Sequence, residues 1–200
     1  MRKYFPALQY INVPNIVTTI GLFFAVAACY FLSIGSLRGT IICVSIAMLM
    51  DLVDGLLADK LNQQTRFGAY LDSFVDFFVC CIVPALMVYT FLGISIPLIA
   101  AITFFCACGM WRLAYYQVTS VDAVVKRTYF TGLPVPGGAL LVTIAIWVTV
   151  NFGLPAWVCT LAFLMTGLLM LSFFKLEKYG LWQKAMWLLG LGFFGLVVAS

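Results

Sequence analysis

Four aspartates occupy two short stretches of the sequence, and their spacing is that of residues sharing a helix face. Asp51 and Asp54 are three positions apart, and Asp72 and Asp76 are four apart, so in helices the members of each pair would be neighbours. Both pairs lie in or beside apolar stretches, where a charged side chain is costly unless it is paired, hydrated or bound to a metal ion. The four carboxylates therefore require a positive counter-charge.

The available ligand types indicate a hard divalent cation. The chain contains no histidine, and its 7 cysteines fall inside apolar stretches without the paired spacing of a zinc site. Carboxylate oxygens suit Mg²⁺ or Mn²⁺, and the number of carboxylates indicates two ions, a pairing that recurs in phosphoryl transfer. Small residues beside these faces would let the phosphates of a ligand approach the backbone; they are Gly55, Ala58, Gly68 and Ala69.

The same carboxylates could instead couple ions in a transporter or form ion pairs between helices. The nearby cations Lys60, Arg66 and Arg112 are too few to neutralise the cluster, which favours a bound metal. A cation transporter remains an alternative, although the inverted repeats typical of many transporters are not evident, because the acidic cluster occurs once.

The composition places these residues in a membrane protein. The chain is 64% hydrophobic and 9% charged, against about 25% charged in soluble domains, which excludes an ordinary water-soluble fold. The net charge of +4 is modest, and we expect no nucleic-acid partner. Seven apolar stretches could each cross most of a ~30 Å hydrocarbon core as a helix; they are 15–34, 39–57, 69–92, 95–116, 136–150, 154–174 and 181–199.

We therefore expect an all-α polytopic transmembrane helix bundle of six to seven spans, forming one domain over residues 1–200. Residues 1–14 carry cations and aromatic side chains, which predicts a short interfacial segment before the first span. With the N-terminus in the cytoplasm, ten of the 11 Lys and Arg residues lie inside and only Arg38 lies outside, as the positive-inside rule requires. The aspartates then lie near the cytoplasmic face of the cell membrane.

Residues 51–76 read DLVDGLLADKLNQQTRFGAYLDSFVD. This stretch resembles the signature of the CDP-alcohol phosphatidyltransferase family, D-x-x-D-G-x-x-A-R, eight residues, then G-x-x-x-D-x-x-x-D. One position departs, because Asp59, followed by Lys60, stands where the family has arginine. The matching positions are Asp51, Asp54, Gly55, Ala58, Gly68, Asp72 and Asp76.

Further stretches extend the resemblance from about residue 14 to residue 175. PNIVT at 14–18 is similar to the P-N-x-x-T opening of the first span in these enzymes, although Asn15 and Thr18 could also simply cap that helix. WRLAYYQV at 111–118 and YFTGLPVPGGA at 129–139 are similar to the R-L-A-R-F-N and F-x-G-L-P-x-P-A-A patterns of the phosphatidylserine synthase branch. Tyr115 and Gln117 replace the second arginine and the asparagine of the first pattern.

The resemblance implies an enzyme that transfers a phosphatidyl group from CDP-diacylglycerol to a small alcohol and releases CMP. L-serine is the leading acceptor; glycerol 3-phosphate, inositol phosphate and choline are alternatives. Homodimers are usual in the family, so we expect this protein to form one. We also expect its helices to contact membrane lipid.

The resemblance also implies roles for individual residues. Asp51, Asp54, Asp72 and Asp76 would hold two divalent cations, and Asp76 would also accept the proton of the acceptor hydroxyl. Arg112, Lys126 and Arg127 are expected to bind the anionic group of the acceptor or a lipid phosphate. Nucleotide contacts are expected from Asn15, Thr18, Asp51, Asp54, Gly55, Ala58, Gly68 and Asp72.

Overall fold

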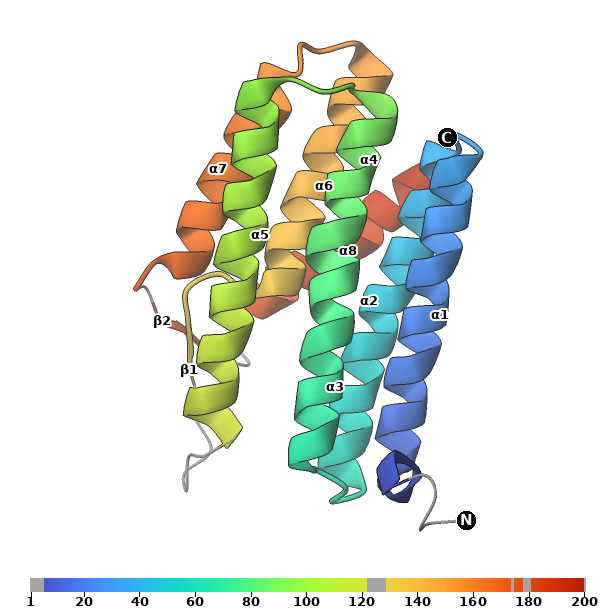
Figure 1. Ribbon diagram of the computed structural model, residues 1–200, viewed down its shortest axis with the longest axis vertical. Helices are drawn as coiled ribbons and strands as arrows, with labels where there is room; N and C mark the ends of the chain where they lie inside the picture. Colours follow the sequence, from blue (N-terminus) through green and yellow to red (C-terminus); the bar gives the residue numbers. More distant parts are fainter. Residues whose placement is uncertain (1–5, 122–128, 174, 178–180, 200) are drawn as a thin grey trace.

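The computed structural model is a bundle of long helices with one helix running obliquely across it, and it describes residues 6–121, 129–173, 175–177 and 181–199 (Figure 1). The first half of the chain forms η1 (Pro6–Tyr10), α1 (Val13–Ser33), α2 (Leu37–Lys60), α3 (Arg66–Phe77), η2 (Phe78–Ile82) and α4 (Val83–Phe91). The second half forms α5 (Ile96–Tyr116), η3 (Gln117–Val121), β1 (Tyr129–Thr131), α6 (Val135–Phe152), α7 (Trp157–Leu171), β2 (Lys175–Glu177) and α8 (Leu181–Ala199).

The expected all-α membrane bundle is confirmed, and the chain is a multi-pass membrane protein. Within the described residues, 5 helices have the length and composition to cross a membrane. They are α1, α2, the continuous helix Arg66–Phe91, α5 with the start of η3, and α6. Two further apolar helical segments, Trp157–Leu171 and Leu188–Ala199, are shorter.

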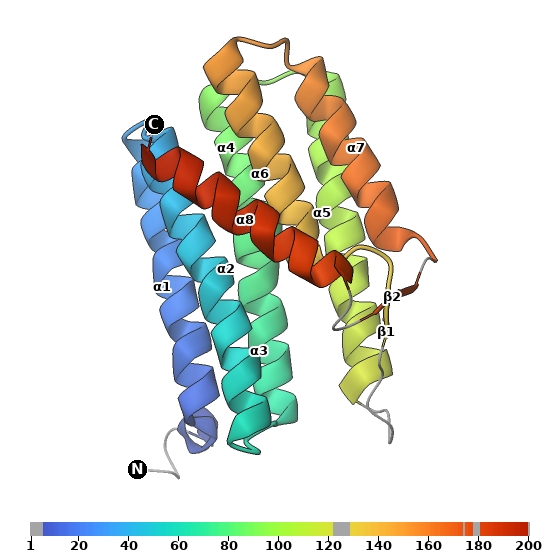
Figure 2. The same cartoon turned by 180° about the vertical axis from the view of Figure 1, so that it is seen from behind.

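The helix boundaries follow from capping residues. Asn12 accepts a hydrogen bond from the backbone N–H of Asn15 at 2.9 Å, and Ser36 accepts one from Gly39 at 3.2 Å. Thr65 likewise accepts from the N–H of Gly68 at 3.0 Å, so each of the first three long helices begins at a side-chain cap. The connections between them are short, which makes α1, α2 and α3 neighbours in the bundle (Figures 1 and 2).

The third span changes its helical geometry in the middle. Residues Phe78–Ile82 form a π-helical turn between α3 and α4, directly before Pro84. Proline has no N–H and its ring crowds the carbonyl four residues earlier, which here belongs to Cys80. The wider π turn accommodates this crowding, so the span remains continuous below and above it.

Two elements at the end of the chain were not expected in this form. The strands β1 and β2 pair antiparallel, with Phe130 opposite Leu176, in two connections between predicted helices for which the sequence predicts no strand. Helix α8 runs obliquely across α2 and α6 (Figure 2), and the guanidinium of Arg38 at the start of α2 donates a hydrogen bond to the carbonyl of Val198 near its end.

The α1–α2 pair is packed through small side chains. Gly21, Ala25 and Ala28 of α1 are buried, as is Ala47 of α2. In a membrane, where lipid tails are as apolar as the side chains, close backbone approach through small residues is a main source of helix association.

Gly39 supplies the test of this packing. A β-carbon at Gly39 would meet the ring of Phe31 on α1, with Cγ at 2.7 Å, so Gly39→Ala should destabilise the fold by about 1–3 kcal/mol through overpacking. Thermal unfolding in detergent would show this as a lower Tm. Gly192→Ala is the matched control because no described atom lies within 4 Å of its β-carbon position; equal Tm values for both variants would contradict the packing described.

Candidate active site

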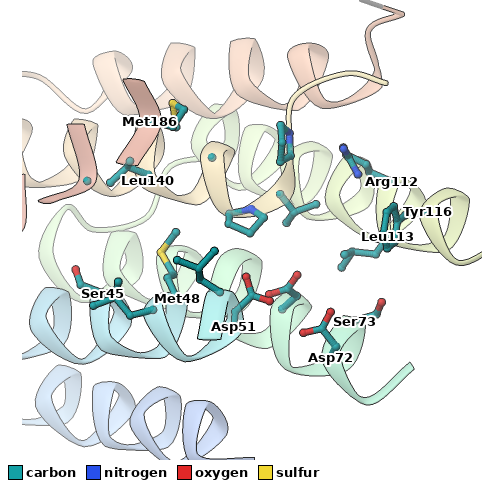
Figure 3. Close-up of a pocket in the computed structure, with 18 of the residues that line it drawn as sticks. Ser45, Met48, Asp51, Asp72, Ser73, Arg112, Leu113, Tyr116, Leu140 and Met186 are labelled. Carbon is teal, nitrogen blue, oxygen red and sulfur yellow. The ribbon is translucent and has the colours of Figure 1, made fainter. Parts of the chain in front are cut away.

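Three of the four predicted aspartates converge. One carboxylate oxygen from each of Asp51, Asp72 and Asp76 lies within 4.8 Å of the other two, and all three side chains are half-buried. Asp51 comes from α2, whereas Asp72 and Asp76 come from consecutive turns of α3. The group can form because α3 returns beside α2 after a short loop (Figure 3).

Asp54 has a different partner. Its side chain is buried, and its carboxylate accepts a hydrogen bond from the hydroxyl of Thr18 on α1. Residues three apart on a helix differ in direction by about 60°, and residues four apart by about 40°, so Asp54 turns towards α1 while Asp72 and Asp76 stay together. Asp54 remains near enough to Asp51 for mutual charge repulsion, and its role as a metal ligand stays a prediction.

The start of α1 forms a polar corner beside the aspartates. Asn15 is buried, and its Nδ2 donates to the carbonyl of Tyr10 at 2.8 Å. The cap of α1 is Asn12 and not Asn15. Capping therefore does not account for Asn15, and its predicted contact with the nucleotide stays a prediction. The ring of Tyr10 stacks on Phe67 with centroids 4.6 Å apart, which fixes η1 against the start of α3.

The small residues of the signature have distinct environments. A β-carbon at Gly68 would lie 2.7 Å from Oδ1 of Asn15, so only glycine allows this approach of α1 to α3. At Gly55 no described atom lies within 4 Å of the β-carbon position, which leaves open space beside Asp54. Ala58 is half-buried one turn further along α2.

A cavity of about 310 Å³ opens beside the three carboxylates. Its polar end contains Asp51, Asp72 and Asp76, and its far end is lined by apolar side chains of α2, α6 and α8 (Figure 3). The cavity can thus hold a molecule with an anionic and an apolar part. The apolar lining includes Met48, Leu49, Leu52, Leu140, Met186, Leu191 and Phe194.

Arg112 supplies the positive charge of this cavity. It extends from α5 beside Leu113 and Tyr116 (Figure 3), is 7% exposed, and its Nε has no hydrogen-bond partner within the described part of the chain. Asp76 lies near enough to attract it electrostatically. A buried donor of this kind can bind an anionic oxygen. The other two predicted cations, Lys126 and Arg127, lie outside the described residues.

Several lining residues were not found from the sequence. Ser73 lies three positions before Asp76, and Tyr116 lies four positions after Arg112, so helical spacing could have indicated both. Gln117, which contacts Ser73, could have been singled out only as a departure from the family pattern. The contribution of α8 depends on its oblique path, which no local pattern reveals.

The carboxylate oxygens and the buried arginine fit a site for a divalent cation and a phosphorylated ligand. Comparisons with known proteins support this interpretation. A sequence model described as CDP-alcohol phosphatidyltransferase matches residues 11–168. A CDP-diacylglycerol–serine O-phosphatidyltransferase of Methanocaldococcus jannaschii is 30% identical over 90% of this chain and 77% of its own length. The enzyme of the same name from Bacillus subtilis is 25% identical over 82% of this chain and 91% of its own length.

Metal affinity tests the carboxylate group directly. Asp51→Asn removes one charged ligand, and we expect the affinity for Mn²⁺ to fall by at least about tenfold, the lower end of the cost of disturbing even an outer-shell contact. Electron paramagnetic resonance of free Mn²⁺ during a titration measures this. Asp59→Asn is the control, because Asp59 is exposed at the end of α2 and accepts a hydrogen bond from Gln64; a similar loss in both variants would contradict the assignment.

Proposed function

The chain belongs to the CDP-alcohol phosphatidyltransferase family, and from this we propose that it transfers the phosphatidyl group of CDP-diacylglycerol to the hydroxyl of L-serine and releases CMP. The observation that carries the proposal is the combination of three converging carboxylates, a buried arginine and an apolar extension in one cavity. CDP-diacylglycerol has the matching parts, namely a diphosphate, a nucleoside and two acyl chains.

Asp51, Asp72 and Asp76 would hold Mg²⁺ or Mn²⁺, with Asp54 as a further ligand and two ions as the expected number. Bound there, the ions would polarise the diphosphate and offset the charge that develops on CMP as it leaves. The protein contributes rigid placement: two carboxylates lie on consecutive turns of α3, and the third lies on the adjacent helix. Such preorganisation is effective because the charges need no rearrangement during the reaction.

Asp76 is the proposed base. During transfer, the acceptor oxygen forms a bond to the β-phosphorus, the bond from that phosphorus to the oxygen of CMP breaks, and the hydroxyl proton passes to a carboxylate. Asp76 lies near enough to Arg112 to interact with it electrostatically, and Arg112 would hold the anionic group of the acceptor. An acceptor bound by Arg112 would therefore have its hydroxyl near a carboxylate, as general base catalysis requires.

The nucleotide is assigned to the polar corner formed by Asn15, Thr18, Asp54 and Gly68, and the open space at Gly55 would admit it. The acyl chains would occupy the apolar end of the cavity between α2, α6 and α8. Lys126 and Arg127 are proposed to contact lipid or acceptor phosphate on the sequence pattern alone. The enzyme is further proposed to act as a homodimer at the cytoplasmic face of the cell membrane.

L-serine is favoured as the acceptor because the two relatives named above are serine O-phosphatidyltransferases. The cavity supports this choice, since it presents one arginine among its described lining residues. A carboxylate needs fewer cationic partners than a phosphate, so glycerol 3-phosphate or inositol phosphate would be expected to require more.

Activity of the purified protein tests the proposal. With CDP-diacylglycerol and Mn²⁺, L-serine should stimulate CMP release more than glycerol 3-phosphate, inositol phosphate or choline. Asp76→Asn should reduce the rate by at least about 100-fold, the lower range for general base catalysis. Gly192→Ala serves as the control. CMP release that is insensitive to Asp76→Asn, or an absence of CMP with every acceptor, would contradict the proposed function.

Membrane orientation can be measured with single cysteines at the two ends of the bundle. Leu61 and Ile94 are exposed in turns that the charge distribution places inside and outside, respectively. In intact cells, a membrane-impermeant maleimide should label Ile94→Cys and spare Leu61→Cys until the cells are opened. The native cysteines are buried or half-buried, which keeps the background low; the opposite labelling pattern would refute a cytoplasmic site.

A further inference from the structure

The hydroxyl of Ser73 has an unusual environment for a helical serine. Hydroxyls in helix interiors commonly donate to the carbonyl four residues earlier, and several threonines of this chain do so. At Ser73 the corresponding carbonyl, that of Ala69, accepts instead from Nε2 of Gln117 at 2.6 Å, and the same nitrogen donates to Oγ of Ser73 at 2.5 Å. The conventional bonds are Thr19 to Asn15, Thr40 to Ser36, Thr90 to Leu86, Thr119 to Tyr115 and Thr160 to Ala156.

The direction of these bonds is determined by chemistry. A backbone carbonyl can only accept, so the side-chain atom of Gln117 that contacts Ala69 must be the amide nitrogen. Ser73 therefore accepts from that nitrogen, and its own proton remains to be donated elsewhere. Gln117 is 7% exposed and begins the π-helical turn η3 after α5. The amide that donates to Oγ of Ser73 is therefore buried.

Ser73 lines the cavity together with Arg112 and Tyr116, and it lies on α3 across from Leu113 and Tyr116 of α5 (Figure 3). Ser73 and Arg112 both offer N–H or O–H donors there, and Nε of Arg112 has no partner among the described residues. Two such donors lining one cavity suit an anionic oxygen. The diphosphate is assigned to the carboxylate-bound ions, which leaves the carboxylate of the acceptor for these donors.

Resting on the proposed function, we infer that Ser73 donates a hydrogen bond to the carboxylate of the amino-acid acceptor, and that Gln117 is the positioning residue that directs this proton into the cavity. Without Gln117, the hydroxyl would be free to donate to the Ala69 carbonyl, as the threonines above do to theirs. Ser73 is thus a specificity-determining residue for the acceptor, and it acts through a different contact from the metal ligands.

Steady-state kinetics separates this role from a structural one. Ser73→Ala and Gln117→Met should each raise KM for L-serine by about tenfold, the effect of losing one hydrogen bond to a charged group. KM for CDP-diacylglycerol and the affinity for Mn²⁺ should stay unchanged. Because both substitutions remove the same hydrogen bond, the double variant should show no more than the single effect.

Thr119→Val is the matched control, since Thr119 lies on the same π-helical turn as Gln117 and its hydroxyl donates to the carbonyl of Tyr115 at the end of α5 at 2.8 Å. An unchanged KM for L-serine in Ser73→Ala, a rise in KM for CDP-diacylglycerol instead, or additive effects in the double variant would overturn the inference. If Gln117→Met does not fold, Ser73→Ala decides the question. Absence of serine-dependent CMP release in the unmodified protein would instead overturn the proposed function, and the inference with it.

Discussion

The mutual repulsion of carboxylates inside an apolar helix bundle is the constraint on which the rest of this structure depends. Asp51, Asp72 and Asp76 approach within 4.8 Å of one another, and Asp54 adds a fourth acidic group nearby. Burial of like charges at this distance is unfavourable without a compensating cation. Arg112 provides one positive charge within the described cavity lining, which leaves room for divalent ions as the remaining compensation.

The surrounding helices keep these groups in place. The small-residue contact between α1 and α2 brings Thr18 against Asp54, and the approach of α1 to α3 brings Asn15 against Gly68. Gln117 connects η3 to α3 on the other side. The oblique helix α8 closes the apolar end of the cavity. One cavity can therefore bind both the polar and the apolar part of a substrate. Its side chains are already held in place by folding, so they lose little conformational freedom when the substrate binds.

Much of the fold follows from local signals. Apolar stretches broken by proline, glycine and charge locate every long helix, because the membrane requires each span to satisfy its own backbone hydrogen bonds. The convergence of Asp51 with Asp72 and Asp76 follows from helical spacing and a short loop. The turn of Asp54 towards Thr18 and the β1–β2 pairing depend on contacts between distant segments. For the same reason, the contact between Ser73 and Gln117 depends on the packing of η3 against α3.

Anomalous X-ray scattering from Mn²⁺-soaked crystals is the most direct test of the central claim. The account predicts anomalous density among the carboxylates of Asp51, Asp72 and Asp76, with a second peak on the Asp54 side. Density confined to other parts of the protein, or full-strength density in a variant with all three aspartates replaced by asparagine, would contradict it.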